Sequence, residues 1–191
     1  MYRTLTLFLL LNFMAVLNAA DNMAFKAGVF DPPRPAPDFS LDGSNGTELK
    51  LGHYRGKVVI LAFGFTSCPD VCPITLAVLA QARKKLGAEG DDVQVVYITV
   101  DPERDDVESM HNYLSVFDET FVGGTGTSEQ LVTVRKEYGI MAEKKITGIS
   151  YSVAHSSYTY LIDRDGNLRA LMPYGSGPDE YVNDLRILLK Q

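Results

Sequence analysis

The sequence predicts an α/β fold, in which a central mixed sheet is flanked by helices and preceded by an N-terminal hairpin. Two almost continuously apolar, β-branched runs, 57–65 and 93–100, are typical of strands buried on both faces of a sheet. Apolar residues recur at helical spacing in 73–86, after the first run, and 105–117, after the second, is a predicted helix with acidic residues in its first turn. Because strands and helices alternate, parallel strands joined by crossover helices are expected.

Composition favours one folded domain. The chain has 191 residues, of which 46% are hydrophobic and 22% charged, close to the average for soluble globular proteins. A formal net charge of −6 leaves no basic stripe to neutralise phosphates, so nucleic acid is not expected as a partner.

The first 20 residues resemble a signal peptide. Arg3 supplies a positive charge, an apolar stretch follows over 5–17, and Ala19 and Ala20 are small residues suited to cleavage. This stretch is shorter than the roughly 20 residues that a membrane-spanning helix needs, which favours cleavage over a retained anchor. We therefore expect export to a periplasmic or other extracytoplasmic compartment, as a soluble or tethered protein. Proline-rich residues 21–36 are expected to be an extended lead-in, with order beginning near Asp38.

The domain is expected to cover 37–191. Residues 39–51 predict the hairpin, because short strand-like segments flank a turn rich in Gly, Asn and Asp. Beyond the two buried strands and their helices, the sequence predicts a glycine-rich segment, a helix, two strands around a turn and a last helix, over 121–126, 127–138, 158–163, 168–172 and 178–189. This order matches a thioredoxin-like layout, in which ligands gather at the carboxyl ends of the strands.

Both cysteines of the chain lie in one short window, Cys68 to Cys72, at a predicted strand-to-helix junction. A disulfide across this window closes a short loop and restricts the unfolded chain little, so the pair is expected to serve reactivity or metal binding. The helix N-terminus is expected to lower the thiol pKa values and favour thiolate. Thiolate is the form that binds metal or attacks a disulfide.

Two thiolates and an imidazole suit copper, because Cu(I) prefers soft thiolate ligands. Structural zinc normally takes four protein ligands, and the chain offers two cysteines and three histidines at no zinc-finger spacing. His155 is the best third candidate, because it precedes the 158–163 strand on a loop that the expected fold brings over the cysteines. The equally weighted alternative is that His155 is a partly buried loop histidine whose hydrogen bonds are satisfied within the fold.

Three segments in order resemble the Sco/SenC family: Phe65 to Pro73 (FTSCPDVCP), Val100 to Asp105 (VDPERD) and His155 to Asp163 (HSSYTYLID). The likeness extends over roughly residues 36–190. It implies a thioredoxin-like fold and a copper ion bound by Cys68, Cys72 and His155. It also implies delivery of copper to the dinuclear site of cytochrome c oxidase subunit II, or to another copper protein, with a membrane-associated partner. The chain departs from many relatives in its short leader and in Ala154, which stands where they carry an acidic residue.

Two other functions stay open. An extracytoplasmic thiol–disulfide oxidoreductase would use Cys68 and Cys72 to keep partner cysteines reduced. A metallochaperone, by contrast, needs no enzymatic turnover. Either role requires an outside thiol reductant in an oxidising compartment. A peroxiredoxin-like peroxidase is a weaker alternative, because two cysteines four apart at one helix start are not the usual peroxidatic arrangement.

Several further residues have a structural and a functional interpretation. Asp101 is expected to cap the helix that starts near Asp105, or else to support the site. Asp70 is a solvated turn residue or a modulator of the sulfurs. The remaining histidines and the scattered methionines are expected not to be ligands: His53, His111, Met110, Met141 and Met172.

Overall fold

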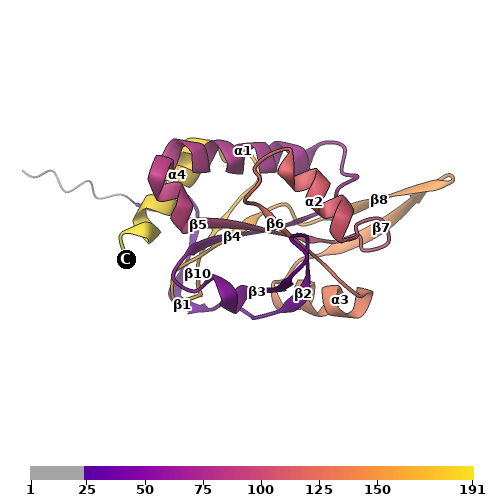
Figure 1. The fold of residues 1–191 in the computed structure, drawn as a ribbon, viewed down its shortest axis with the longest axis horizontal. Coiled ribbons are helices and arrows are strands. Elements are labelled where there is room, and N and C mark those ends of the chain that lie inside the picture. The colour runs from indigo at the N-terminus through magenta and orange to yellow at the C-terminus, as the bar shows by residue number, and fades with distance from the viewer. Residues whose placement is uncertain (1–23) are drawn as a thin grey trace, which may run out of the picture.

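The computed structural model describes residues 24–191, and its main feature is one eight-stranded mixed sheet. The strands lie in the order β1-β10-β9-β4-β5-β6-β2-β3, and Figure 1 shows them as one twisted layer. In chain order their bounds are Gly28–Pro35 (β1), Ser40–Gly43 (β2), Glu48–Lys50 (β3), Val58–Gly64 (β4), Val93–Thr99 (β5), Val122–Thr125 (β6), Thr159–Ile162 (β9) and Asn167–Met172 (β10). The predicted α/β fold is confirmed.

The centre of the sheet consists of β4 and β5, which are parallel and paired along their whole lengths, from Val58 opposite Val93 to Gly64 opposite Thr99. Every residue of both strands is buried. β6 continues the parallel part, whereas β9, β10 and β1 on one side and β2 and β3 on the other are antiparallel. The apolar runs of the sequence therefore form the core strands that the pattern predicts.

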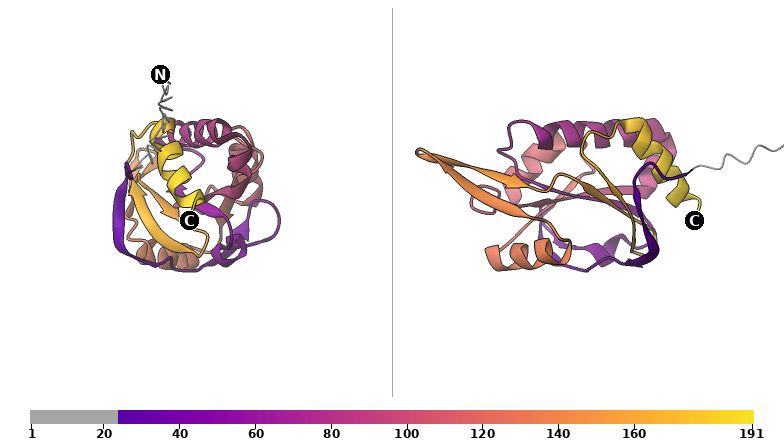
Figure 2. Two further views of the ribbon diagram at one scale, coloured as in Figure 1. Left: turned by 90° about the vertical axis from the view of Figure 1, so that its left-hand side faces the viewer. Right: turned by 180° about the vertical axis from the view of Figure 1, so that it is seen from behind.

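Four α-helices cover the sheet: α1 (Val71–Leu86), α2 (Val107–Ser115), α3 (Ser128–Glu137) and α4 (Pro178–Leu189). Figures 1 and 2 show α1 and α4 side by side over one face and α3 on the other face. Reciprocal capping boxes start two of the helices, with Asp106 and Ser109 at α2 and Thr127 and Gln130 at α3. Short 3-10 helices occupy Leu51–Tyr54 and Gly87–Asp92.

The ordered domain begins earlier than the sequence predicts. Residues 28–35, expected to belong to a lead-in, form edge strand β1 and pair antiparallel with β10, with an irregular register between Val29 and Arg34. The prolines obscured this strand, yet an edge strand tolerates them because its outer N–H groups need no partner. Buried Asp184 of α4 also fixes the residues just before β1. Its carboxylate accepts hydrogen bonds from the backbone N–H groups of Lys26 and Ala27, at 2.7 and 2.9 Å.

A second sheet lies outside the sequence prediction. Strands β7 (Ala142–Thr147) and β8 (Ser150–His155) form an antiparallel hairpin that pairs with no strand of the main sheet. Figures 1 and 2 show this hairpin projecting well beyond the body of the protein. Its tip carries two isoleucines, Ile146 and Ile149, that are almost fully exposed.

The expected signal peptide, residues 1–20, lies outside the described residues. Within 24–191, none of the helices has both the length and the apolar character that crossing a membrane requires.

Candidate metal centre

The cysteine pair follows the end of strand β4, as the sequence predicts. Cys68 lies in the loop after Gly64 and is partly exposed, whereas Cys72 lies in the first turn of α1 and is 3% exposed. The Cys72 backbone N–H points at the Cys68 sulfur, at 3.5 Å. Both cysteines are free thiols, so the strand-to-helix junction presents two sulfurs within one helical turn.

A buried carboxylate that sequence reasoning missed fixes the start of this loop. Asp105 is fully buried and accepts from the backbone N–H of Thr66 at 3.0 Å and from its hydroxyl at 2.5 Å. The Thr99 hydroxyl, at the end of β5, donates to the same carboxylate at 2.6 Å. Asp105 thereby ties the residue two places before Cys68 to the central sheet. The sequence predicts Asp105 only as a residue at the start of a helix, and that helix begins later, at Val107.

His155 reaches the cysteines from the other end of the domain sequence. Its Nδ1 or Nε2 and the sulfurs of Cys68 and Cys72 all lie within 4.8 Å of one another. Within residues 24–191, these three residues form the one group of His, Cys, Asp or Glu side chains that is close enough together to hold a metal ion. The predicted meeting of the three residues is confirmed, with one correction: His155 ends strand β8 and does not lie on a loop.

The imidazole is oriented for ligation through Nε2. Nδ1 lies 2.8 Å from the Ser156 carbonyl oxygen, which only accepts, so Nδ1 carries the proton. Nε2 therefore has a free lone pair, and it lies 3.5 Å from the Cys72 sulfur. Burial also lowers the pKa of His155, which favours the neutral form of the ring. Such a backbone partner is what holds ligand imidazoles in one tautomer.

Burial is the largest cause of the pKa shift of Cys72. It raises the pKa of the Cys72 thiol to about 12, the Cys68 side chain adds to the rise, and the Tyr97 hydroxyl acts in the opposite direction. The expected lowering by the helix dipole is therefore wrong for Cys72. A metal ion that binds there must displace a proton, so the site suits a soft cation that bonds strongly to thiolate.

A contact network connects the His155 hairpin to the loop after β5. The Tyr151 hydroxyl, on β8, donates to the Asp101 carboxylate at 2.9 Å, and Arg104 Nε donates to the other carboxylate oxygen at 2.5 Å. Asp101 is 4% exposed, and helix α2 is capped by Asp106. The expectation that Asp101 caps that helix is therefore wrong, and its carboxylate instead holds the hairpin that carries His155.

Aromatic contacts continue this network to the imidazole. The Arg104 guanidinium carbon lies 4.0 Å from the centre of the Tyr151 ring and 5.5 Å from that of Phe65. The Phe65 ring in turn meets His155 edge-on, with ring centres 5.9 Å apart. Phe65, Arg104 and Tyr151 thus pack between the cysteine loop and the hairpin.

The other sequence candidates lie away from the cluster. Asp70 is exposed and makes no side-chain cap at the start of α1. His53 and His111 are exposed, and neither joins the three-residue group. Met110 and Met172 are fully buried in the core, and Met141 is exposed.

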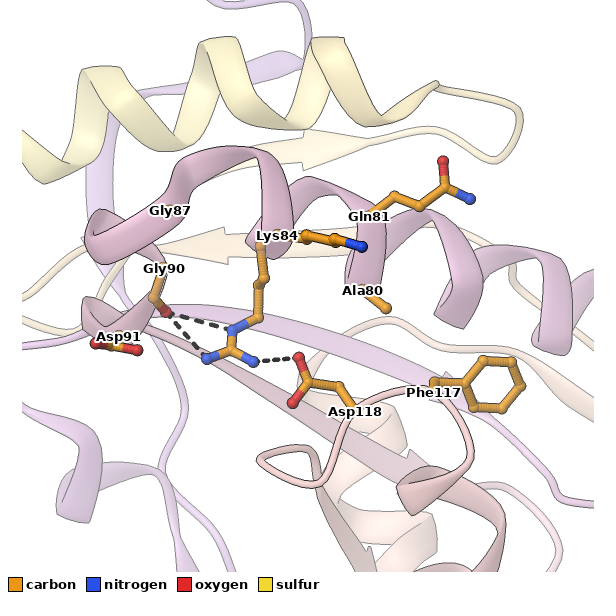
Figure 3. A pocket seen from close by; sticks show the side chains of 9 residues that line it. Ala80, Gln81, Lys84, Gly87, Gly90, Asp91, Phe117 and Asp118 are labelled. Carbon is orange, nitrogen blue, oxygen red and sulfur yellow. Dashed lines mark hydrogen bonds and ion pairs between the residues drawn. The ribbon is translucent and has the colours of Figure 1, made fainter.

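A larger groove, with a volume of about 390 Å³, lies away from this site between the end of α1 and the turn after α2. Figure 3 shows it with Gly90 and Asp118 on its two sides. Arg83 spans it, donating to the carbonyls of Gly90 and Val93 and to the Asp118 carboxylate. These bonds occupy the guanidinium, so Arg83 joins α1 to the sheet, and the exposed Lys84 also lines the groove.

Comparisons with known proteins agree with the geometry. The profile of the SCO1/SenC family matches residues 31–190. A mouse protein named Protein SCO2 homolog, mitochondrial, is 43% identical over 153 residues, which is 78% of this chain and 60% of the mouse protein. This chain therefore spans less than two thirds of that relative.

Two solved structures share the fold. Arabidopsis thaliana ScoI, described with copper bound, has a TM-score of 0.77 and 34% identity, with 82% of this chain and 98% of that chain covered. BsSco, described as having a disulfide switch and as a member of the Sco family of cytochrome c oxidase assembly proteins, has a TM-score of 0.67 and 24% identity. The match covers 83% of this chain and 95% of BsSco. These structures confirm the thioredoxin-like arrangement.

Proposed function

Because the chain belongs to the SCO1/SenC family, we propose that it is a copper metallochaperone whose Cys68, Cys72 and His155 hold the ion. The observation that carries this proposal is the convergence of the three ligand atoms within 4.8 Å. The 3.5 Å between Cys72 Sγ and His155 Nε2 is close to the spacing of two ligands that share a metal at roughly 2.0–2.3 Å. Copper bound to the Arabidopsis relative supports the choice of metal.

The exposure of the site suits the transfer of a cargo ion. Cys68 and His155 are partly exposed, so a partner's ligands can approach the metal while Cys72 still holds it from the buried side. The association of the Sco family with cytochrome c oxidase assembly makes the oxidase the proposed recipient. Within it we propose subunit II, with a thiol reductant that returns the cysteines to the reduced form.

The proposed location is extracytoplasmic, with residues 1–20 as the export signal. A Bacillus anthracis relative described as a lipoprotein of the SCO1/SenC family supports a position at a membrane surface. A membrane-associated recipient such as the oxidase is consistent with that location.

The test is a titration with Cu(I) that compares the wild type, His155→Ala and His111→Ala. His111 is the matched control, because it is an exposed histidine outside the three-residue group. Wild type and His111→Ala should each bind one equivalent with the same affinity. Removal of a direct ligand should weaken binding by more than the roughly 10–100-fold that follows loss of a residue supporting a ligand. Equal affinity in all three proteins would remove His155 from the ligand set.

A second candidate, thiol–disulfide exchange, is favoured by the free thiols and by the exposure of Cys68. The Cys68 thiolate would attack a partner disulfide and release one partner thiol, and Cys72 would then attack the mixed disulfide and release the second. Two electrons pass to the partner, and Cys68 and Cys72 end as a disulfide that an outside dithiol must reduce. This activity should survive in His155→Ala, whereas Cys72→Ala should accumulate the mixed disulfide.

A further inference from the structure

Tyr97 is a buried residue whose hydroxyl makes no hydrogen bond to the rest of the described fold. It lies in central strand β5 and is 1% exposed. A buried hydroxyl without a hydrogen-bond partner costs free energy, so the groups that surround it need an explanation. A phenylalanine would fill the same space without this cost.

The hydroxyl faces the metal-binding side of the core. A Cβ placed on Gly64 would lie 2.8 Å from the Cys72 sulfur, 2.7 Å from the Tyr97 ring carbon that bears the oxygen, and closer still to the oxygen itself. The phenol and the sulfur therefore meet over Gly64, where any larger residue would separate them. Tyr97 also lines a small cavity together with Cys72 and His155.

We propose that Tyr97 is a positioning residue of the metal centre, whose hydroxyl donates a hydrogen bond to the Cys72 sulfur when that sulfur is a metal-bound thiolate. The inference rests on the proposed role of Cys72 as a ligand. It explains the missing partner, because a neutral thiol is a weak acceptor and a thiolate is a strong one. The hydroxyl already lies close enough to the Cys72 sulfur to lower the pKa of its thiol, and its donated bond strengthens when the sulfur is a thiolate.

Such a bond affects the metal as well as the sulfur. Donation to a ligand sulfur withdraws electron density from it, and hydrogen bonding around the sulfur is one way in which proteins tune copper thiolate sites. Cu(I) carries more electron density than Cu(II), so the bond favours Cu(I). Tyr97 would then help to keep the cargo in its reduced form.

The test compares Tyr97→Phe with Tyr113→Phe. Tyr113 is a matched control, because its hydroxyl is also buried without a partner and its ring centre lies 6.4 Å from that of Tyr97, yet it does not line the cavity. Tyr97→Phe should weaken Cu(I) binding about tenfold, the equivalent of one hydrogen bond to a charged group. It should also move the sulfur-to-Cu(II) charge-transfer band to lower energy, because the sulfur becomes more electron-rich. Tyr113→Phe should change neither.

A change in packing alone would not reproduce this result. The metal-free Tyr97→Phe protein should be as resistant to urea as the wild type or more so, since it loses only an unpartnered hydroxyl. An unchanged band, or the same shift in Tyr113→Phe, would overturn the proposal.

Cadmium separates this inference from the proposed function. Cd²⁺ is a soft ion that binds thiolates, and the ¹¹³Cd resonance responds to electron density on the sulfur. If the wild type bound no copper, the chaperone proposal would fail, and cadmium would still decide the role of Tyr97. A ¹¹³Cd shift altered by Tyr97→Phe and unaltered by Tyr113→Phe supports the hydrogen bond, and equal shifts in all three proteins reject it.

Discussion

The candidate ligands come from two regions that differ in how firmly the fold holds them. Cys68 and Cys72 follow β4, whose residues are all buried and which pairs with strands on both sides. His155 ends β8, a strand whose residues alternate between exposed and half-buried and which pairs only with β7. Figure 2 shows the two regions clearly, the first inside the layered body and the second on the projecting arm.

This difference assigns the ligands different tasks. A sulfur site built on the core keeps its geometry whether or not a metal is present. An imidazole on an arm held by a few side-chain contacts can move away at a small cost in free energy, because local openings of weakly packed elements are much cheaper than global unfolding. For the proposed metallochaperone, which would hold an ion and then release it, the arm is the place expected for the ligand that is exchanged first.

Amide hydrogen exchange should show the largest contrast between the regions. We expect amides of β5 to exchange only through global unfolding, and amides of β7 and β8 to exchange roughly a thousandfold faster or more through local opening. Addition of Cu(I) should slow exchange in β8 strongly and leave β5 unchanged. Equal protection of β5 and β8 in the metal-free protein would contradict the proposed mobile arm.

Removal of the Asp105 carboxylate should have the next largest effect, on the cysteine side. Asp105→Ala leaves the Thr66 and Thr99 hydroxyls without their acceptor in a buried position and should cost about 2–4 kcal/mol of unfolding free energy. The neighbouring Asp106→Ala removes an exposed helix cap and should cost only about 1 kcal/mol. Urea unfolding measures both variants, and equal losses would show that Asp105 acts only as a helix-start residue.

Crowding the space between Tyr97 and Cys72 should damage the core and the metal site together. Gly64→Ala places a methyl group too close to both side chains and should cost about 1–3 kcal/mol through overpacking. Gly56→Ala is not an equivalent control, because Gly56 has a positive φ of 86°, which strains an alanine there. Gly28, on edge strand β1, provides the control, since a Cβ there meets only one backbone oxygen at 3.9 Å. Equal unfolding midpoints for the two variants would refute the crowding.

Weakening the hairpin anchor should have the smallest effect on stability. Tyr151→Phe loses the hydrogen bond to Asp101 and keeps the ring over Arg104, so it should cost no more than about 1 kcal/mol. Its effect should appear in copper affinity, which should fall severalfold because His155 is held less firmly. Calorimetric titration checks this, with Tyr158→Phe as control, since Tyr158 donates to Gly139 outside the anchor. An unchanged affinity would show that the anchor does not position the imidazole.

The sequence predicted the central part of the fold because hydrophobic pattern and local order agree there. The runs that became β4 and β5 are apolar on both faces, and α1 and α4 show clear helical spacing. The prediction from the sequence failed at the edges of the fold, where pairing with residues distant in the sequence decides whether a strand forms. β1 contains prolines that only an edge position permits, and the β7–β8 hairpin carries exposed isoleucines and an inner face on β8 that is only half-buried.

The residues of the candidate metal centre also divide into those that the sequence indicated and those that only the structure shows. The spacing of Cys68 and Cys72 predicts a reactive or metal-binding pair, whereas the position of His155 left a structural role equally open and the family resemblance implied its role as a ligand. The supporting residues were not evident, because Asp105 and Asp101 look like ordinary helix-start residues in the sequence. Tyr97 reads as one more apolar position in a buried strand. The pairing of β4 with β5 sets Tyr97 opposite Ala62, two residues before Gly64, and its ring reaches the space over Gly64 beside Cys72.

X-ray absorption at the copper edge tests the central claim most directly, because it reports the atoms bound to the ion. The Cu(I)-loaded wild type should show two sulfur neighbours and the scattering pattern of one imidazole, and His155→Ala should keep the sulfurs and lose the imidazole. Imidazole scattering that persisted in His155→Ala, or a wild-type shell without two sulfurs, would contradict the three-residue site.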